Sequence, residues 1–118
     1  MIDHLELRTR DLPASVRFYA AVLEPLGYQL TAAARGTGFG DAHGHDFFLV
    51  QGEPADHTHF AFRAASRALV RSCCEQGATL NALERIPALA AHIHPNYYAG
   101  YVRDPDGRLV EFTCHESE

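Results

Sequence analysis

The chain has 118 residues, 47% of them hydrophobic, which supports one domain with a real core and is too short for two ordinary domains. Its formal net charge is −5 and its pI is near 5.9, so it lacks the basic surface with which proteins bind nucleic acids. No run of 18 apolar residues is present, and we expect no membrane-spanning helix.

The cysteines and the first residues indicate a reducing compartment. Cys73 and Cys74 are adjacent and Cys114 is the third cysteine, so all three cannot pair, and reduced thiols are expected. Residues 1–7 (MIDHLEL) carry acids where a secretory signal needs a basic region and then an apolar stretch. We therefore expect a cytoplasmic protein. Eight histidines are many for so short a chain, and they indicate metal or acid–base chemistry.

The first half of the chain predicts one strand, one helix and three further strands. Residues 2–9 alternate apolar and polar side chains, as a strand does. Asp11 is expected to cap a helix with Pro13 in its first turn, and this helix should continue to about Leu26 and end at Gly27. Short strands separated by glycine-rich turns are expected at 28–34, 38–41 and 47–51.

The second half repeats this order after a linker at 54–57. Residues 58–63 predict a strand, and Ser66 is expected to cap a helix that runs to about Gln76 and stops at Gly77. Residues 87–96 are expected to form a loop. The remaining strands are expected near 79–86, 97–103 and 108–114.

The two halves form an internal repeat. The segment HLELR, from His4, aligns with HFAFR, 55 residues later; DAHGHDFFL, from Asp41, aligns with DPDGRLVEF, 63 residues later. We therefore predict a single α+β domain over residues 1–118 with two βαβββ modules, at about 1–52 and 57–115. The modules are expected to form a curved, cup-like mixed sheet with the helices outside.

Strand alternation selects three candidate metal ligands. In each of three strands the apolar residues face one way, which puts His4, His59 and Glu111 on the face away from the helices. Each residue alone is more often a solvated side chain than a ligand, but their matching positions in the repeat favour a shared site. Two histidines and one carboxylate with open positions suit Fe(II) or Mn(II), and zinc accepts the same ligands.

The turn at 104–107 (DPDG) decides which residue faces Glu111. A type I turn followed by a glycine bulge pairs Tyr101 with Glu111, whereas a four-residue loop would put Gly100 there. With the bulge, Tyr101 becomes a candidate catalytic phenol that donates a hydrogen bond to a bound oxyanion or relays a proton. The structural alternative is a half-buried tyrosine packed in a strand.

Aromatic side chains are expected to form a wall near this site. Phe48 and Tyr98 are its candidate substrate contacts, and Tyr97 and Phe39 are its other members. His94 belongs to the predicted loop, where a lid or surface role is favoured over metal binding, and we expect it to contact substrate.

Three motifs together resemble the vicinal oxygen chelate superfamily, which includes glyoxalase I, bleomycin-resistance proteins, fosfomycin-resistance thiol transferases and extradiol dioxygenases. The motifs are HxxLxxxDLxxSxxFY from His4, HFAF from His59 and DPDGxxVE ending at Glu111. The resemblance extends over nearly the whole chain and does not identify one member of the superfamily.

The resemblance implies an eight-stranded cup that holds a divalent metal ion (Fe, Mn, Ni or Zn) on His4, His59 and Glu111. It implies an enzyme that acts on a small substrate with adjacent oxygens, as a lyase, isomerase or thiol transferase, in which Glu111 or a metal-bound water moves the proton. Short members usually form homodimers, in some of which His4 would meet His59 and Glu111 across the interface. The alternative that it implies is a non-catalytic, drug-sequestering protein.

Two positions depart from the patterns of individual branches. Glyoxalase I-like enzymes carry a fourth, acidic ligand where this chain has Phe48, which cannot bind a metal ion. Fosfomycin transferases typically carry threonine where this chain has Glu6. These departures favour a site with three protein ligands and leave the branch open.

Overall fold

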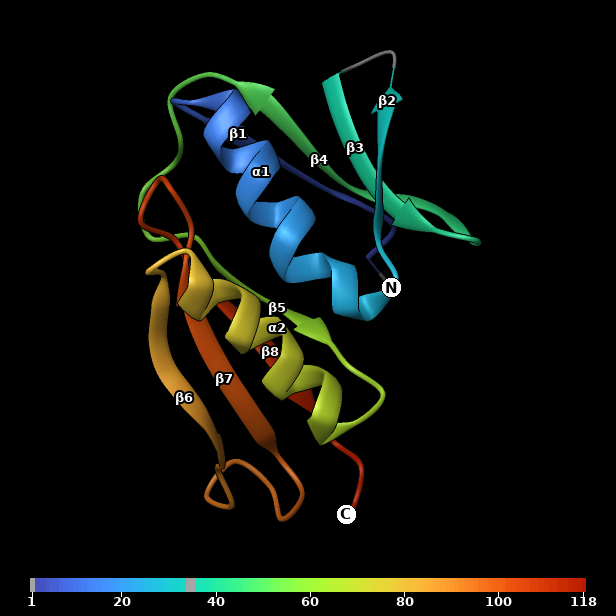
Figure 1. Ribbon diagram of the computed structural model, residues 1–118, viewed down its shortest axis with the longest axis vertical. Helices are drawn as coiled ribbons and strands as arrows, with labels where there is room; N and C mark the ends of the chain where they lie inside the picture. The colour runs from blue at the N-terminus through green and yellow to red at the C-terminus, as the bar shows by residue number, and fades with distance from the viewer. Residues whose placement is uncertain (1, 34–35) are drawn as a thin grey trace.

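The computed structural model describes residues 2–33 and 36–118, and each half of the chain folds as a βαβββ module (Figure 1). The first module consists of β1 (Leu5–Thr9), α1 (Leu12–Leu23), the short 3₁₀ helix η1 (Glu24–Leu26), β2 (Gln29–Ala33), β3 (Gly36–Asp41) and β4 (Gly44–Gln51). The second consists of β5 (His59–Arg63), α2 (Arg67–Thr79), β6 (Leu83–Leu89), β7 (Tyr98–Arg103) and β8 (Leu109–Cys114).

The sheets confirm the predicted fold class and the internal repeat. The strand orders are β1-β4-β3-β2 and β5-β8-β7-β6, and in each sheet the first pair is parallel and the others antiparallel. The repeat extends to single residues, since the pairing of Glu6 with Phe48 is matched by that of Ala61 with Glu111. Hydrogen bonding divides the eight strands into two four-stranded sheets, with β1 and β5 each at the end of its sheet.

The two helices cover one side of the strands and lie side by side (Figure 1). Between them and the sheets is a core of fully buried side chains that includes Tyr19, Phe47 and Phe112. Phe47 of β4 contacts Phe62 of β5, with ring centroids 5.4 Å apart, so the core is continuous between the modules. Packing the apolar faces against the helices leaves the opposite, polar strand faces for a site.

A buried polar network attaches the turn at 104–107 to the first module. Asp104 accepts hydrogen bonds from the Tyr19 hydroxyl at 2.5 Å and from the Arg108 guanidinium at 2.9 Å. The Arg108 guanidinium also donates to the carbonyl oxygen of Arg8, and the backbone N–H of Arg10 donates to Asp106 at 3.0 Å. Charged groups buried this deeply need such partners, so the network fixes where the turn sits on β1 and α1.

The predicted element boundaries were wrong at two places in the second module. The helix continues through Gly77 to Thr79. Gly77 packs so closely on β7 that an added Cβ would lie 2.5 Å from Cγ1 of Val102, so the close approach explains the glycine. Strand β6 extends into the predicted loop and includes Pro87, which is tolerated because β6 is an edge strand with pairing irregularities.

The other boundaries agree to within a few residues. Asp11 caps α1 through a hydrogen bond from the backbone N–H of Ala14, and Gly27 ends η1 in the left-handed region at φ 81°. Ser66 caps α2 as predicted. The predicted end of the second strand, Ala34, lies outside the described residues. Among the residues that the structure describes, no helix is long and apolar enough to cross a membrane.

Candidate functional site

His59 and Glu111 meet on the polar face of the second module, at the parallel pair of β5 and β8. Nε2 of His59 lies 3.2 Å from Oε2 of Glu111. The Glu111 side chain is only 6% exposed, whereas His59 is about half exposed. Two of the three predicted ligands are therefore together, and a buried carboxylate has an accessible imidazole beside it.

The orientation of the His59 ring directs Nε2 toward the Glu111 carboxylate. Nδ1 lies 2.9 Å from the carbonyl oxygen of Leu109, which can only accept, so Nδ1 carries the proton. Nε2 would then present a lone pair to the Glu111 carboxylate unless a proton or a metal ion lies between them. This arrangement, in which a backbone carbonyl holds one ring nitrogen and frees the other, is typical of metal-ligating histidines.

The spacing also suits a metal ion. Nitrogen and oxygen ligands lie about 2.0–2.2 Å from a metal such as zinc, so two neighbouring ligands of one ion are about 3 Å apart. The 3.2 Å between His59 and Glu111 matches that separation. A protonated His59 would satisfy the same geometry as an ion pair, and the donor pair alone does not decide between them.

Tyr101 pairs with Glu111 in the antiparallel ladder of β7 and β8, as predicted from the glycine bulge. Gly107 has the left-handed φ of 84° that this turn requires. The Tyr101 ring stacks on that of His59, with centroids 6.4 Å apart. The Arg85 guanidinium also lies over the Tyr101 ring, 5.0 Å from its centroid. Burial and the charge of Glu111 raise the pKa of Tyr101, so its phenol remains a proton donor at neutral pH.

Tyr97 makes a contact with this site that the sequence reasoning missed. Its hydroxyl donates a hydrogen bond to Oε1 of Glu111 at 2.5 Å. Tyr97 was predicted only as part of an aromatic wall. The alternation that places Tyr101 on the polar face also places Tyr97 there, because Tyr97 precedes Tyr101 by four residues. Burial and the hydrogen bond to Glu111 raise the pKa of Tyr97.

His4 lies apart from His59 and Glu111, on the polar face of the first module. Its Nδ1 is 2.7 Å from Oδ1 of Asp3, and its ring meets that of Phe48 edge to face, with centroids 5.9 Å apart. Within residues 2–33 and 36–118, no three histidine, cysteine, aspartate or glutamate side chains of one chain lie close enough to hold a metal ion. The predicted three-ligand set is therefore not assembled by the described part of a single chain.

The remaining predicted contacts lie in different places. His94 packs against Tyr97, with ring centroids 5.3 Å apart, and is thus near the site. Tyr98 instead faces α2, where the guanidinium groups of Arg67 and Arg71 lie over its ring. Phe39 is fully buried in the core beneath α1, so the prediction that it lines the site was wrong.

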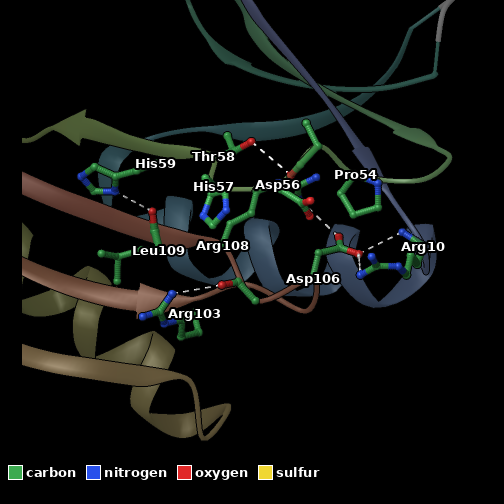
Figure 2. Close-up of a pocket in the computed structure, with 12 residues that line it drawn as sticks. Arg10, Pro54, Asp56, His57, Thr58, His59, Arg103, Asp106, Arg108 and Leu109 are labelled. Carbon is green, nitrogen blue, oxygen red and sulfur yellow. Dashed lines mark hydrogen bonds and ion pairs between the residues drawn. The ribbon is translucent and has the colours of Figure 1, made fainter.

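His59 borders two open spaces of different character. A polar cleft of about 320 Å³ lies between the linker at 54–58 and the turn at 104–107, with His59 at one end (Figure 2). Arg10 and Arg103 reach its wall, and each is paired with an acid, Glu53 and Glu84 respectively. An apolar groove of about 460 Å³ runs between the modules, lined by side chains that include Leu5, Tyr28, Phe47, Phe60 and Phe62.

The sequence and the fold both match known proteins. A family model described as the Glyoxalase/Bleomycin resistance protein/Dioxygenase superfamily matches residues 1–112. No functionally curated protein matches the chain.

Three similar solved structures illustrate the range of relatives. A glyoxalase/bleomycin resistance protein from Albidiferax ferrireducens T118 is 22% identical with a TM-score of 0.78, covering 97% of this chain and 98% of its own. Lactoylglutathione lyase from Agrobacterium tumefaciens is 22% identical with a TM-score of 0.67, covering 97% and 92%. The fosfomycin resistance protein FosX from Mesorhizobium loti is 20% identical with a TM-score of 0.71, covering 98% and 92%. At these identities the likeness establishes the fold alone.

Proposed function

Because the chain belongs to the glyoxalase/bleomycin resistance protein/dioxygenase superfamily, we propose that it is a divalent-metal-dependent enzyme acting on a small substrate with two adjacent oxygens. The observation that carries the proposal is the His59–Glu111 pair, in which the hydrogen bond from Nδ1 to Leu109 turns Nε2 toward a buried carboxylate 3.2 Å away. A buried carboxylate is costly without a positive partner, and a divalent ion on these two side chains would supply one.

In this proposal His59, Glu111 and Tyr101 have different chemical roles. A divalent ion held by His59 and Glu111 would act as a Lewis acid toward the two substrate oxygens. Tyr101, with its phenol protonated, donates a hydrogen bond to the substrate oxygen that gains negative charge. Glu111 holds the ion and accepts or returns the proton that moves during the reaction.

The proposed substrate contacts come from both modules. His94 lies at the second-module end of the site, beside Tyr97, and Phe48 lies beside His4 on the first module. Tyr98 is not retained as a contact because it faces α2. The reaction class remains that of a lyase, isomerase or thiol transferase, and adducts of methylglyoxal with thiols, fosfomycin and catechols are the substrates to screen.

The proposed enzyme is a homodimer in the cytoplasm whose site is completed by His4 of a second chain. Two observations support the shared site. His4 and His59 occupy equivalent positions of the repeat, and Asp3 binds Nδ1 of His4, which leaves Nε2 free as a ligand. In addition, β1 and β5 are edge strands, and an unpaired strand edge is a surface on which a second chain can dock. The three free thiols agree with a reducing compartment.

Metal analysis of protein purified without added ions tests the proposal. The expected result is about one divalent ion per chain in the wild type and a loss of that ion in the His59→Ala variant. His43→Ala, which removes an exposed histidine from the β3–β4 turn, is the matched control and should keep its metal content. No metal in the wild type, and no calorimetric binding of Mn²⁺, Fe²⁺, Ni²⁺ or Zn²⁺, would refute a metalloenzyme.

Mixing two defective chains tests whether the site is shared. If His4 of one chain meets His59 of the other, a heterodimer of His4→Ala and His59→Ala chains contains one intact site and one site without either histidine. Co-expressed and purified as a heterodimer, the pair should bind about half as much metal as the wild type. Metal-free heterodimers would contradict a shared site.

One observation favours a second candidate, a non-catalytic protein that sequesters an apolar small molecule. The groove between the modules is lined mainly by aliphatic and aromatic side chains and is large enough, at about 460 Å³, for a drug-sized ligand. This function needs no metal ion. Retention of hydrophobic-ligand binding by metal-free protein and by the His59→Ala variant would support it.

A further inference from the structure

The two oxygens of the Glu111 carboxylate have different partners. Oε1 accepts a hydrogen bond from the Tyr97 hydroxyl at 2.5 Å, and Oε2 faces Nε2 of His59 at 3.2 Å. Tyr101, which pairs with Glu111 across the ladder of β7 and β8, is the second phenol beside this carboxylate. Since the Glu111 side chain is almost fully buried, water cannot readily take the place of the Tyr97 hydroxyl.

The Tyr97 ring is itself held in place by a cluster of aromatic rings and by the backbone. Its centroid lies 5.3 Å from that of His94 and 5.0 Å from that of His115, and the two histidine rings are 4.6 Å apart. The backbone N–H of Tyr97 donates to the His94 carbonyl at 3.1 Å, and its carbonyl accepts from Ala90 at 2.6 Å. A side chain fixed on several sides can fix its own hydrogen-bond partner in turn.

We propose that Tyr97 is a positioning residue for Glu111: it occupies one carboxylate oxygen and thereby presents the other, Oε2, to the cation shared with His59. This inference rests on the proposed function, and it concerns a residue that touches neither the cation nor the substrate. It also gives the loop before β7 a role, because His94 supports the ring of Tyr97. Hydrogen-bond partners of metal-binding side chains typically change metal affinity by about 10–100-fold when removed.

The matched control for Tyr97 is its neighbour in the chain. Tyr98 also has a partner for its hydroxyl, the Arg71 guanidinium at 3.5 Å, but that contact lies on the opposite side of the sheet, against α2. Tyr97→Phe and Tyr98→Phe each remove one hydroxyl from adjacent residues and keep both rings. A general loss of stability would affect both variants, whereas a loss of positioning would affect Tyr97→Phe alone.

Two measurements on the full chain test the proposal. Calorimetric titration of metal-free protein with Mn²⁺ should show a dissociation constant about 10–100-fold higher for Tyr97→Phe than for the wild type, and within about twofold for Tyr98→Phe. Crystal structures of the metal-free wild type and Tyr97→Phe should show that Oε2 of Glu111 leaves Nε2 of His59 only in the variant. An unchanged Mn²⁺ affinity in Tyr97→Phe, or an unmoved Glu111, would overturn the positioning role.

The two measurements also separate this inference from the proposed function. If wild-type protein binds no Mn²⁺, Fe²⁺, Ni²⁺ or Zn²⁺, the metalloenzyme proposal fails, and the crystal structures alone decide whether Tyr97 orients Glu111. In that case a displaced Glu111 in Tyr97→Phe still supports positioning, toward a protonated His59. A wild type that binds metal and a Tyr97→Phe variant that binds equally well would leave the proposed function intact and refute the inference.

Discussion

The buried network around Asp104 yields a graded prediction for stability. Removing the Tyr19 hydroxyl (Tyr19→Phe) deletes a 2.5 Å hydrogen bond to a charged group, and such bonds contribute about 1.5–3 kcal/mol. Asp104→Asn removes the charge itself and leaves the guanidinium of Arg108, 4% exposed, with Asp106 at 3.3 Å as its remaining acidic partner. Breaking a buried pair in this way costs about 3–5 kcal/mol, so Asp104→Asn should be the more damaging change.

Urea unfolding followed by circular dichroism, at one fixed protein concentration, measures both effects; the chain has no tryptophan for fluorescence. With a urea dependence of about 2 kcal/mol/M, the midpoint should fall by roughly 1 M for Tyr19→Phe and roughly 2 M for Asp104→Asn. The slope of the transition should not change, because neither substitution alters the surface exposed on unfolding.

Tyr28→Phe is the matched control for the tyrosine. Its hydroxyl donates to Asp46 at 2.9 Å on the surface, where water replaces the lost bond, so the cost should stay below about 1 kcal/mol. A Tyr19→Phe variant no less stable than Tyr28→Phe, or an Asp104→Asn variant more stable than Tyr19→Phe, would refute the account of how the turn is anchored.

Three other predictions concern single sites. Gly77→Ala should lower the melting temperature, because a Cβ 2.5 Å from Val102 costs about 1–3 kcal/mol in overpacking and the gain in helix propensity is about 1 kcal/mol; a higher melting temperature would contradict this. Burial raises the pKa of the Cys73 thiol to about 12, so at pH 8 this cysteine should react with a disulfide reagent roughly 1,000-fold more slowly in the native protein than in urea, and equal rates would contradict the burial. Burial, followed by the charges of Arg63 and His94, lowers the pKa of His115 below 6.5, so its contribution to stability should be complete above pH 6.5 and be lost as pH falls through the lowered value. NMR titration should show that the pKa of His115 rises in His94→Ala, and an unchanged pKa would refute the contribution of the His94 charge.

Much of the fold could be predicted because the sequence contains an internal repeat. The alignment of the segments from His4 and His59 predicted equivalent strands, and the observed pairings of Glu6 with Phe48 and of Ala61 with Glu111 are equivalent. Local signals also served well at helix starts, where a single side chain such as that of Asp11 caps the backbone. Glycine was an ambiguous signal for helix ends. Gly27 ends η1, whereas α2 continues through Gly77, whose missing side chain allows close packing on Val102.

The site was less predictable, because alternation predicts the strand face on which a side chain lies and not its distance from side chains on other strands. Strand alternation correctly predicted that His59 and Glu111 share a face, and these two side chains are in contact. It predicted the same face for His4, but His4 contacts Phe48 on the first module and is not part of this pair. The hydrogen bond from Tyr97 to Glu111 depends on how the loop before β7 returns to the sheet, and residues that lie 14 positions apart carry no local signal of it.

The turn at 104–107 links the joining of the modules to the geometry of the site. On one side, its carboxylates bind Tyr19 and the backbone N–H of Arg10, both on the first module. On the other, the left-handed Gly107 sets the register that pairs Tyr101 with Glu111. One short turn therefore both contacts the first module and sets the register of β8. A shift of the second module relative to the first would disturb β8. The same turn therefore explains why an acid in the middle of an apolar strand can be held in a fixed orientation toward His59.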